Sequence, residues 1–310
     1  MAAGRGTVTI VVPTHNRYDR LNNLLGSIGV CALPYVTEVV VVDDSEVPLQ
    51  LPNFTGDIPV RHVVLNSRVL ISAAKNAGWR IARSEFVFFI DDDNVVETET
   101  FEPLCSHIFS LPDTAALMPA VLYKRNREIV WVYSTPLAGN RWSFVLVGRN
   151  LPRNSLLEGQ LQETDALPNA CIVRRIALES TGGFDESLRV NSSAYLCQKL
   201  KLSGWKVQAD TGSFIYHDVS LPQDRSFWAY HAMEDPDRVF HEVRDWFVLM
   251  HRLHPDTPFF RLKAILRSLR FLLPNTAAYV ANGGSRRFSL LLNVVQGLVE
   301  GLKITRSAGI

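Results

Sequence analysis

The chain has 310 residues, of which 47% are hydrophobic, so it can bury a full core in one large domain or in a domain with an appendage. Its formal net charge of +1 comes from 32 lysines and arginines against 31 aspartates and glutamates. This balance excludes a molecule-wide field that would attract nucleic acid, so any basic site must be local.

Cysteine usage and hydrophobic runs bear on the cellular compartment. The four cysteines are far apart and form no Cys-x-x-Cys pair, which indicates reduced thiols in a cytosolic protein rather than disulfides or zinc ligands. The residues before Thr7 contain no apolar core of a signal peptide. No uncharged apolar run reaches the roughly 18 residues that span a bilayer. We therefore expect a cytoplasmic protein that at most lies on a membrane.

Four apolar segments in the first third of the chain are predicted to be buried strands. They alternate with helices that run from the loop after Pro13 to about Gly29 and from about Leu70 to Ala82. The four strands are expected at Thr7–Val12, Thr37–Val42, Val60–Leu65 and Phe86–Ile90. This alternation predicts an α/β fold with a mostly parallel, Rossmann-like sheet flanked by helices. Ligands of such sheets bind at the carboxyl ends of the strands.

Polar side chains follow all four strands at those ends. They are Thr14 and Asn16, Asp43 and Asp44, Asn66 and Arg68, and Asp91 to Asp93. The last group places three like charges side by side, which calls for a cationic partner. Asp91 and Asp93 lie on the same side of an extended segment and form an Asp-x-Asp pair suited to Mg²⁺ or Mn²⁺. The alternative is a solvated turn that caps a helix starting at Thr98.

Four motifs resemble the nucleotide-binding half of family 2 glycosyltransferases, which have the GT-A fold. These motifs are Ile10–Arg17, Val41–Ser45, Ala74–Gly78 and Ile90–Asp93, and their order is the family's order. The similarity continues through Gly182–Glu186 to about Asp210, roughly two thirds of the chain.

The resemblance implies roles on the donor side. Thr14 and Arg17 would lie beside the nucleotide, and Asp43 would bind or orient the base. Lys75, where the family often has arginine, or Arg68 would face the diphosphate or the base; otherwise Lys75 is a solvated helix residue. The further residues implied on the nucleotide side are Pro13, Asn16, Asp44, Asp91, Asp92 and Arg244. Arg244 lies on a predicted helix from Val239 to Leu253, and its alternative is a surface arginine.

The resemblance also implies a metal site. Asp91 and Asp93 would bind the ribose and a Mn²⁺ or Mg²⁺ ion, and that ion would neutralise charge on the departing nucleoside diphosphate. His217, at the end of the predicted strand Phe214–Asp218, would complete the site as a third ligand. The alternative for His217 is a structural histidine.

The usual catalytic base of the family is missing. Family members present a Glu-Asp pair shortly after the Gly182–Glu186 motif, whereas this chain has Asn191–Leu196 without a carboxylate. Three explanations remain open. Asp165, Asp185 or Glu186 serves as the base; the protein binds nucleotide without turnover; or the acceptor is a phosphate monoester, which is already an anion at neutral pH because its second pKa is about 6.

The end of the chain is predicted to form two helices. Leu262, Leu266 and Leu269 share one helical face with basic residues interleaved, which suits an anionic membrane surface. Pro274, Asn275, Gly283 and Gly284 are expected to separate this helix from a second one over Phe288–Leu302. The alternative is a helix packed on the domain. We expect a catalytic domain over residues 1–255, with halves 1–97 and 98–255, and a membrane-associating extension over 256–310.

These observations predict a metal-dependent glycosyltransferase that moves a sugar from GDP-mannose or a UDP-sugar to a lipid-linked or polyprenyl phosphate acceptor at the inner membrane face. Inversion at the anomeric carbon is implied by the resemblance alone. The alternatives are transfer to a sugar hydroxyl in glycan assembly and a non-catalytic nucleotide-binding scaffold. A nucleotidyltransferase would have a glycine-rich basic loop after the first strand, which Pro13–Asn16 lacks.

Overall fold

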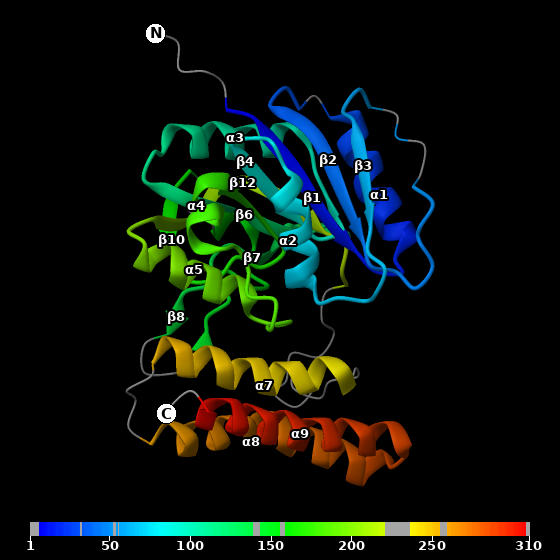
Figure 1. Cartoon of the computed structure of the whole chain (residues 1–310), viewed down its shortest axis with the longest axis vertical. Coiled ribbons are helices and arrows are strands. Elements are labelled where there is room, and N and C mark those ends of the chain that lie inside the picture. The colour runs from blue at the N-terminus through cyan, green and yellow to red at the C-terminus, as the bar shows by residue number, and fades with distance from the viewer. Residues whose placement is uncertain are drawn as a thin grey trace. The chain divides into compact units, whose positions relative to one another are not determined.

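The computed structural model describes residues 6–31, 33–51, 54, 56–138, 143–155, 159–220, 236–254 and 259–307. The chain divides into two compact units. The first comprises Met1–Ser187 and Ser192–Leu221, and the second comprises Leu188–Asn191 and Pro222–Ile310. The first unit holds the sheet, and the second is built from helices (Figure 1).

One large sheet forms the centre of the first unit, in the order β10-β12-β6-β11-β4-β1-β2-β3. Its strands are β1 (Val8–Thr14), β2 (Val36–Asp43), β3 (Val60–Val64), β4 (Phe86–Ile90), β6 (Thr114–Tyr123), β10 (Leu161–Glu163), β11 (Ala170–Arg174) and β12 (Lys206–His217), while β5 (Asn94–Val95) pairs with β12 and β7 (Asn126–Val132) with β6. The strands β4, β1, β2 and β3 are parallel, and β11 is antiparallel to both of its neighbours. The predicted mostly parallel sheet is confirmed.

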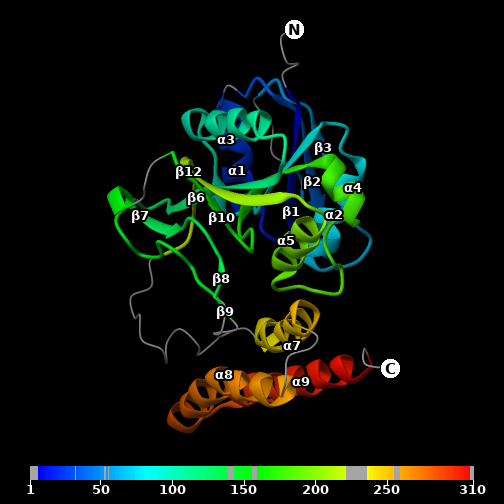
Figure 2. The same ribbon diagram turned by 90° about the vertical axis from the view of Figure 1, so that its left-hand side faces the viewer.

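Helices cover both faces of this sheet (Figure 2). They are α1 (Tyr18–Val30), α2 (Ile71–Ile81), α3 (Thr98–Ser110), α4 (Arg175–Thr181) and α5 (Ser192–Leu202). Successive residues of β4 show the two sides, because Phe88 packs on Phe101 of α3 and Phe89 packs on Phe184 after α4. Both faces of β4 are therefore buried, which explains why its sequence is apolar without alternation.

The predicted boundaries agree with the structure in the first ninety residues and differ later. The sequence from Asp113 to Val121 is typical of a short helix that leads into a strand, but it contains no helix, because α3 ends at Ser110 and β6 begins at Thr114. Short strands β8 (Leu137–Ala138) and β9 (Ser143–Phe144) follow β7. The sequence predicts a turn at Ala138–Asn140; Ala138 ends β8, and Gly139 and Asn140 lie outside the described residues. A 3₁₀ turn, η2, covers Arg153–Ser155.

A buried asparagine fastens α2 to the turn that follows α4. Asn76 accepts hydrogen bonds from the Phe184 and Trp79 N–H groups, and its amide donates to the Phe184 carbonyl and to Glu186. Gly183 has φ +73°, and a Cβ atom there would lie 2.5 Å from Trp79 Nε1. The turn therefore requires glycine at this position for both conformation and space.

The second unit contains α7 (Pro236–Leu253), α8 (Phe260–Asn282) and α9 (Ser285–Ser307). The expected break at Pro274 is wrong, because α8 continues through it and ends only before Gly283 and Gly284, both with positive φ. Burial of Phe271 and Asn275 on either side of Pro274 offsets the lost backbone hydrogen bond. The unit also includes α7, which our sequence division places within residues 1–255.

Candidate active site

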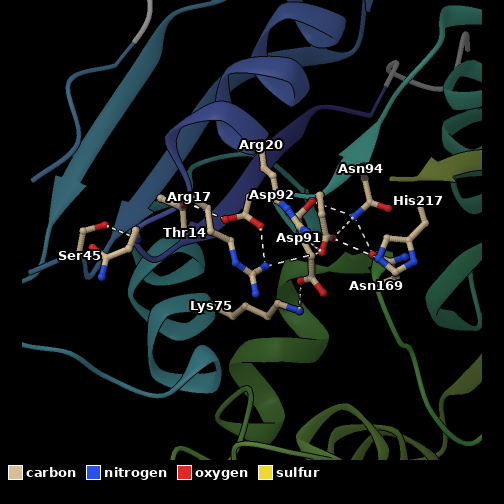
Figure 3. A network of polar contacts seen from close by, with 12 residues as sticks. Thr14, Arg17, Arg20, Ser45, Lys75, Asp91, Asp92, Asn94, Asn169 and His217 are labelled. Atoms are coloured by element: carbon tan, nitrogen blue, oxygen red, sulfur yellow. Dashed lines mark hydrogen bonds and ion pairs between the residues drawn. The ribbon is translucent and has the colours of Figure 1, made fainter. Parts of the chain in front are cut away.

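Strand pairing brings the polar strand ends together at one edge of the sheet. Parallel pairing of β1 with β4 places Thr14 beside the residues after Ile90, and pairing of β1 with β2 places Thr14 opposite Asp43. Antiparallel pairing of β11 with β4 places Asn169 next to Asp91, whose N–H donates to the Asn169 carbonyl. The pair of β5 and β12 sets His217 opposite Asn94. Figure 3 shows the resulting cluster.

Asp92 points back toward the first strand and its loop. It accepts hydrogen bonds from the Thr14 hydroxyl at 2.8 Å and from the Arg17 guanidinium at 3.1 Å. Burial raises the pKa of Asp92 to about 6, although Arg17 and Thr14 oppose that rise. Asp92 thus ties the loop after β1 to the acidic segment.

Asp93 is surrounded by the side-chain nitrogens of two arginines and a histidine. Its Oδ2 lies 2.9 Å from Arg20 and 3.6 Å from Arg17, and its Oδ1 lies 3.4 Å from His217 Nε2. Burial alone would raise the pKa of Asp93, but His217, Arg17 and Arg20 hold it below its ordinary value. Asp93 is therefore an ionised carboxylate that faces an imidazole.

Asp91 points in another direction. It forms an ion pair with the buried Lys75 of α2, whose Nζ lies 2.9 Å from Asp91 Oδ1. The alternative that Lys75 is a solvated helix residue is therefore wrong, because its side chain is packed between the sheet edge and Phe184.

Two buried asparagines, Asn94 and Asn169, hold the acidic segment Asp91–Asp93 in place. The Asn94 amide donates to the Asp91 carbonyl at 2.8 Å and to Asn169 Oδ1 at 2.6 Å. Within the described part of the chain, four buried atoms of this cluster have no hydrogen-bond partner: Asp91 Oδ1, which forms the ion pair with Lys75, and Asn94 Oδ1, Asn169 Nδ2 and His217 Nδ1. Buried polar atoms normally find partners, so these atoms leave the cluster with unused capacity for hydrogen bonding.

The carboxylates after β2 are held by backbone donors. Asp43 is fully buried, accepts hydrogen bonds from the Ser45 and Leu49 N–H groups, and lies 3.1 Å from His62 Nε2. Burial raises the pKa of Asp43, but these hydrogen bonds outweigh it and lower the pKa below its ordinary value.

The neighbouring loops are cross-linked in the same way. Asp44 accepts from the Val69 N–H and lies 3.1 Å from His15 Nδ1. Asn16, in the left-handed region at φ +53°, donates its N–H to Ser45, and Pro13 lies inside β1 opposite Val42. The three loops that follow β1, β2 and β3 thus form one connected wall.

A family model described as glycosyl transferase family 2 matches residues 9–180, which is more than half of the chain. The chain belongs to this family. The pre-mycofactocin glycosyltransferase of Mycobacterium tuberculosis is 27% identical over 216 residues, which is 68% of this chain and 42% of that protein. The chain therefore spans less than half the length of the curated relatives it matches.

Solved structures agree on the fold. The mannosyltransferase PcManGT from Pyrobaculum calidifontis, in complex with GDP-Man and Mn²⁺, has a TM-score of 0.53 and 17% identity over 99% of this chain and 88% of its own. S. aureus TarS 1–349 in complex with UDP-GlcNAc has a TM-score of 0.53 and 15% identity over 97% and 83%. At such identities the likeness shows the GT-A fold alone.

The expected family metal site is only partly assembled. Asp93 and His217 face each other, whereas Asp91 is engaged by Lys75. Within the described ranges, no three His, Cys, Asp or Glu side chains are placed to hold one metal ion. A carboxylate oxygen and an imidazole nitrogen are nevertheless donors that suit Mn²⁺.

The remaining predicted residues lie elsewhere. Arg68 follows β3 in the loop before α2, and Arg244 lies on α7 in the second unit, where it contacts Asp245. Asp165 accepts from Lys201 and from the Leu137 N–H. Asp185 accepts from Ser187, and Glu186 accepts from Asn76 and pairs with Arg80. The role of a general base stays a prediction for all three carboxylates.

Sequence reasoning missed Arg20, Asn94 and Asn169. Arg20 follows Arg17 by three residues in the first turn of α1, so helical spacing puts both on one side. Asn94 directly follows the three aspartates, which was a usable signal. No local signal marks Asn169, because only the pairing of β11 with β4 brings it to the site.

Proposed function

We propose that the protein transfers a sugar from a nucleoside diphosphate sugar to a phosphate-bearing, lipid-linked acceptor and that it needs a divalent metal ion. The observation that carries the proposal is the pairing of ionised Asp93 with His217 beside two arginines at the carboxyl edge of the sheet. This edge is where sheets of this class bind nucleotides.

The chain's own residues can do most of the work on the donor side. Arg17 and Arg20 already neutralise Asp93, and their exposed guanidinium groups can turn to a diphosphate because such fork-shaped donors bind phosphate oxygens well. Asp43 and Asp44 hold the wall against which a base and ribose would lie. Asn169 Nδ2 and Asn94 Oδ1 offer a donor and an acceptor for hydroxyl groups.

Asp93 and His217 would hold the metal ion, with donor phosphates and water completing its coordination. A bound Mn²⁺ or Mg²⁺ supplies charge neutralisation for the leaving diphosphate. The lowered pKa of Asp93 supports this assignment, because the ionised carboxylate is the form that binds a metal ion. The presence of Mn²⁺ in the PcManGT complex also supports it.

The acceptor proposal rests on the engaged carboxylates. Asp165, Asp185 and Glu186 each hold a local turn or an ion pair, and Ser193 accepts a hydrogen bond from the Leu167 N–H where the family base would stand. A sugar hydroxyl needs a base to become nucleophilic, whereas a phosphate monoester does not. A phosphate acceptor therefore fits a site whose nearby carboxylates already have other roles.

The test is transfer from labelled GDP-mannose and UDP-N-acetylglucosamine to polyprenyl phosphate, with Mn²⁺ and with chelator. We expect metal-dependent product, and we expect Asp165→Asn and Glu186→Gln to retain activity wherever they fold. Product formed only with hydroxyl acceptors, and lost in one of these variants, would replace the phosphate acceptor with a base-catalysed reaction. Metal-dependent donor binding without any transfer would favour the scaffold alternative.

A further inference from the structure

The second unit carries a concentrated apolar surface. Among the described residues, 22 large hydrophobic side chains are exposed, and 12 of them lie between Phe259 and Ile304. On α8 they include Leu262, Leu266, Leu269 and Leu273, and on α9 they include Phe288, Leu292, Val295 and Val299. We call these eight residues the outer face. Exposed apolar surface of this extent marks an interaction site.

The outer faces of the two helices point the same way. The buried residues of α9 pack on α7, since added Cβ atoms at Gly297 and Gly301 would lie 2.6 Å from the Phe240 carbonyl and 2.7 Å from Phe247 Cβ. The outer residues of α9 are offset from its buried Leu290 and Val294 by about half a turn.

The inner side of α8 also meets α7. Phe260 packs on Phe247, and the Arg267 guanidinium lies 3.7 Å from the centre of the Trp246 ring. The outer leucines of α8 are on the opposite side, and both views show α8 and α9 next to each other on one side of α7 (Figures 1 and 2). The two outer faces therefore form one surface directed away from α7.

The basic side chains of α8 and α9 indicate which kind of partner this surface would bind. Residues 259–307 contain eight lysines and arginines and a single acidic residue, Glu300. Arg267 is not part of the basic border, because its half-buried guanidinium lies over the Trp246 ring, and burial lowers its pKa to about 8. Arg261 and Lys263 at the start of α8 are exposed on either side of Leu262, and Arg286 is exposed at the start of α9. An apolar face with a basic border complements the headgroups and acyl boundary of an anionic bilayer.

The packing of α9 distinguishes lying on a membrane from crossing it. By length and composition, α9 could span a bilayer between Ser285 and Thr305. Its glycine face, however, is in close contact with α7, whose first turn is acidic at Asp237 and whose last turn contains His251 and Arg252. We propose that α8 and α9 lie together in the plane of an anionic membrane surface, with the outer face buried among the lipids and α7 on the far side from them.

The test is sedimentation of the full-length protein with vesicles of phosphatidylcholine, with and without phosphatidylglycerol. We expect binding to the anionic vesicles that weakens at high salt, and at least a roughly tenfold loss of partitioning in a Leu266→Glu/Leu292→Glu variant. A matched control, Ile176→Glu/Leu202→Glu, changes two exposed apolar residues of the first unit and should bind like the wild type. Circular dichroism checks that both variants are folded.

Two results would overturn the proposal. One is vesicle binding that is absent or that the outer-face variant leaves unchanged. The other is a wild-type dimer that the same variant converts to a monomer, since the outer face would then be covered by a second copy of the chain. Neither readout involves sugar transfer, so this proposal can fail while the proposed function stands, and the reverse also holds.

Discussion

At the scale of single residues, the same side chain acquires different properties from its immediate partners. Asp43 and Asp92 are both buried at the carboxyl edge of the sheet, yet the pKa of Asp43 is lowered and that of Asp92 is raised to about 6. Two backbone N–H groups and His62 stabilise the charge of Asp43. Asp92 has a hydroxyl and an arginine, which do not fully offset its burial.

Replacing Asp43 with asparagine tests the contribution of its charge to stability. A carboxylate with a lowered pKa stabilises the folded state above its unfolded pKa, near 3.8, and this stabilisation is lost as the pH falls through the folded pKa. Asp43→Asn should therefore cost about 1–3 kcal/mol at pH 7, and the difference from the wild type should narrow below pH 3.8. Urea unfolding across pH measures both effects.

Asp57→Asn is the matched control for this prediction, because Asp57 is exposed and replacing it should change stability little at any pH. If the Asp43 and Asp57 variants had the same dependence of unfolding free energy on pH, the charge of Asp43 would have no stabilising role.

At the scale of elements, the turn after α4 shows how a motif of the donor half depends on a distant segment. Asn76 lies in the Ala74–Gly78 motif, and its side chain both accepts from and donates to the Phe184 backbone. Gly78 is needed for space, since a Cβ atom there would lie 2.3 Å from Val11. The sequence motif suggested a ligand role for Lys75. It did not indicate that the next residue, Asn76, joins α2 to the turn after α4.

Two adjacent glycines in this turn allow a controlled stability test. Gly182 and Gly183 both have φ +73°, but an added Cβ atom meets nothing within 4 Å at Gly182 and lies 2.6 Å from Asn76 Oδ1 at Gly183. Gly182→Ala should cost about 1 kcal/mol from backbone conformation, and Gly183→Ala should cost about 2–4 kcal/mol because the Asn76 contacts must also shift. Thermal unfolding of the two variants gives the comparison. Equal losses of stability in the two variants would mean that the Asn76 contacts at Gly183 shift without an energetic cost.

The elements most accessible to prediction were those with strong local patterns. Apolar runs identified β1 to β4, and helical spacing identified α8 despite Pro274, although its end was placed too early. The meeting of Asn94, Asn169 and His217 depends on the pairing of strands far apart in the sequence, which no local pattern encodes. The family's motif order supplied the site's location, whereas the partners of Asp91 and Asp93 came only from the structure.

At the scale of the whole molecule, the two proposals concern separate compact units. The first unit carries the acidic cluster, and the second carries the outer face on α8 and α9. This division differs from our expected boundary after residue 255, because α7 packs with the terminal helices. The periodicity of apolar residues predicted each helix separately. It did not indicate that α7 packs with α8 and α9.

We propose that Asp93 and His217 hold a metal ion that the nucleotide-sugar donor needs. The most direct test is calorimetric binding of GDP-mannose and UDP-N-acetylglucosamine, in Mn²⁺ and in chelator, to the wild type, Asp93→Asn and the control Asp113→Asn. Asp113 pairs with Lys206 before β6, at the opposite edge of the sheet. We predict that the wild type and the control bind one donor at least about tenfold more tightly in Mn²⁺, and that Asp93→Asn shows no such gain. Equal donor affinity in Mn²⁺ and chelator, or an undiminished Mn²⁺ effect in Asp93→Asn, would contradict the claim.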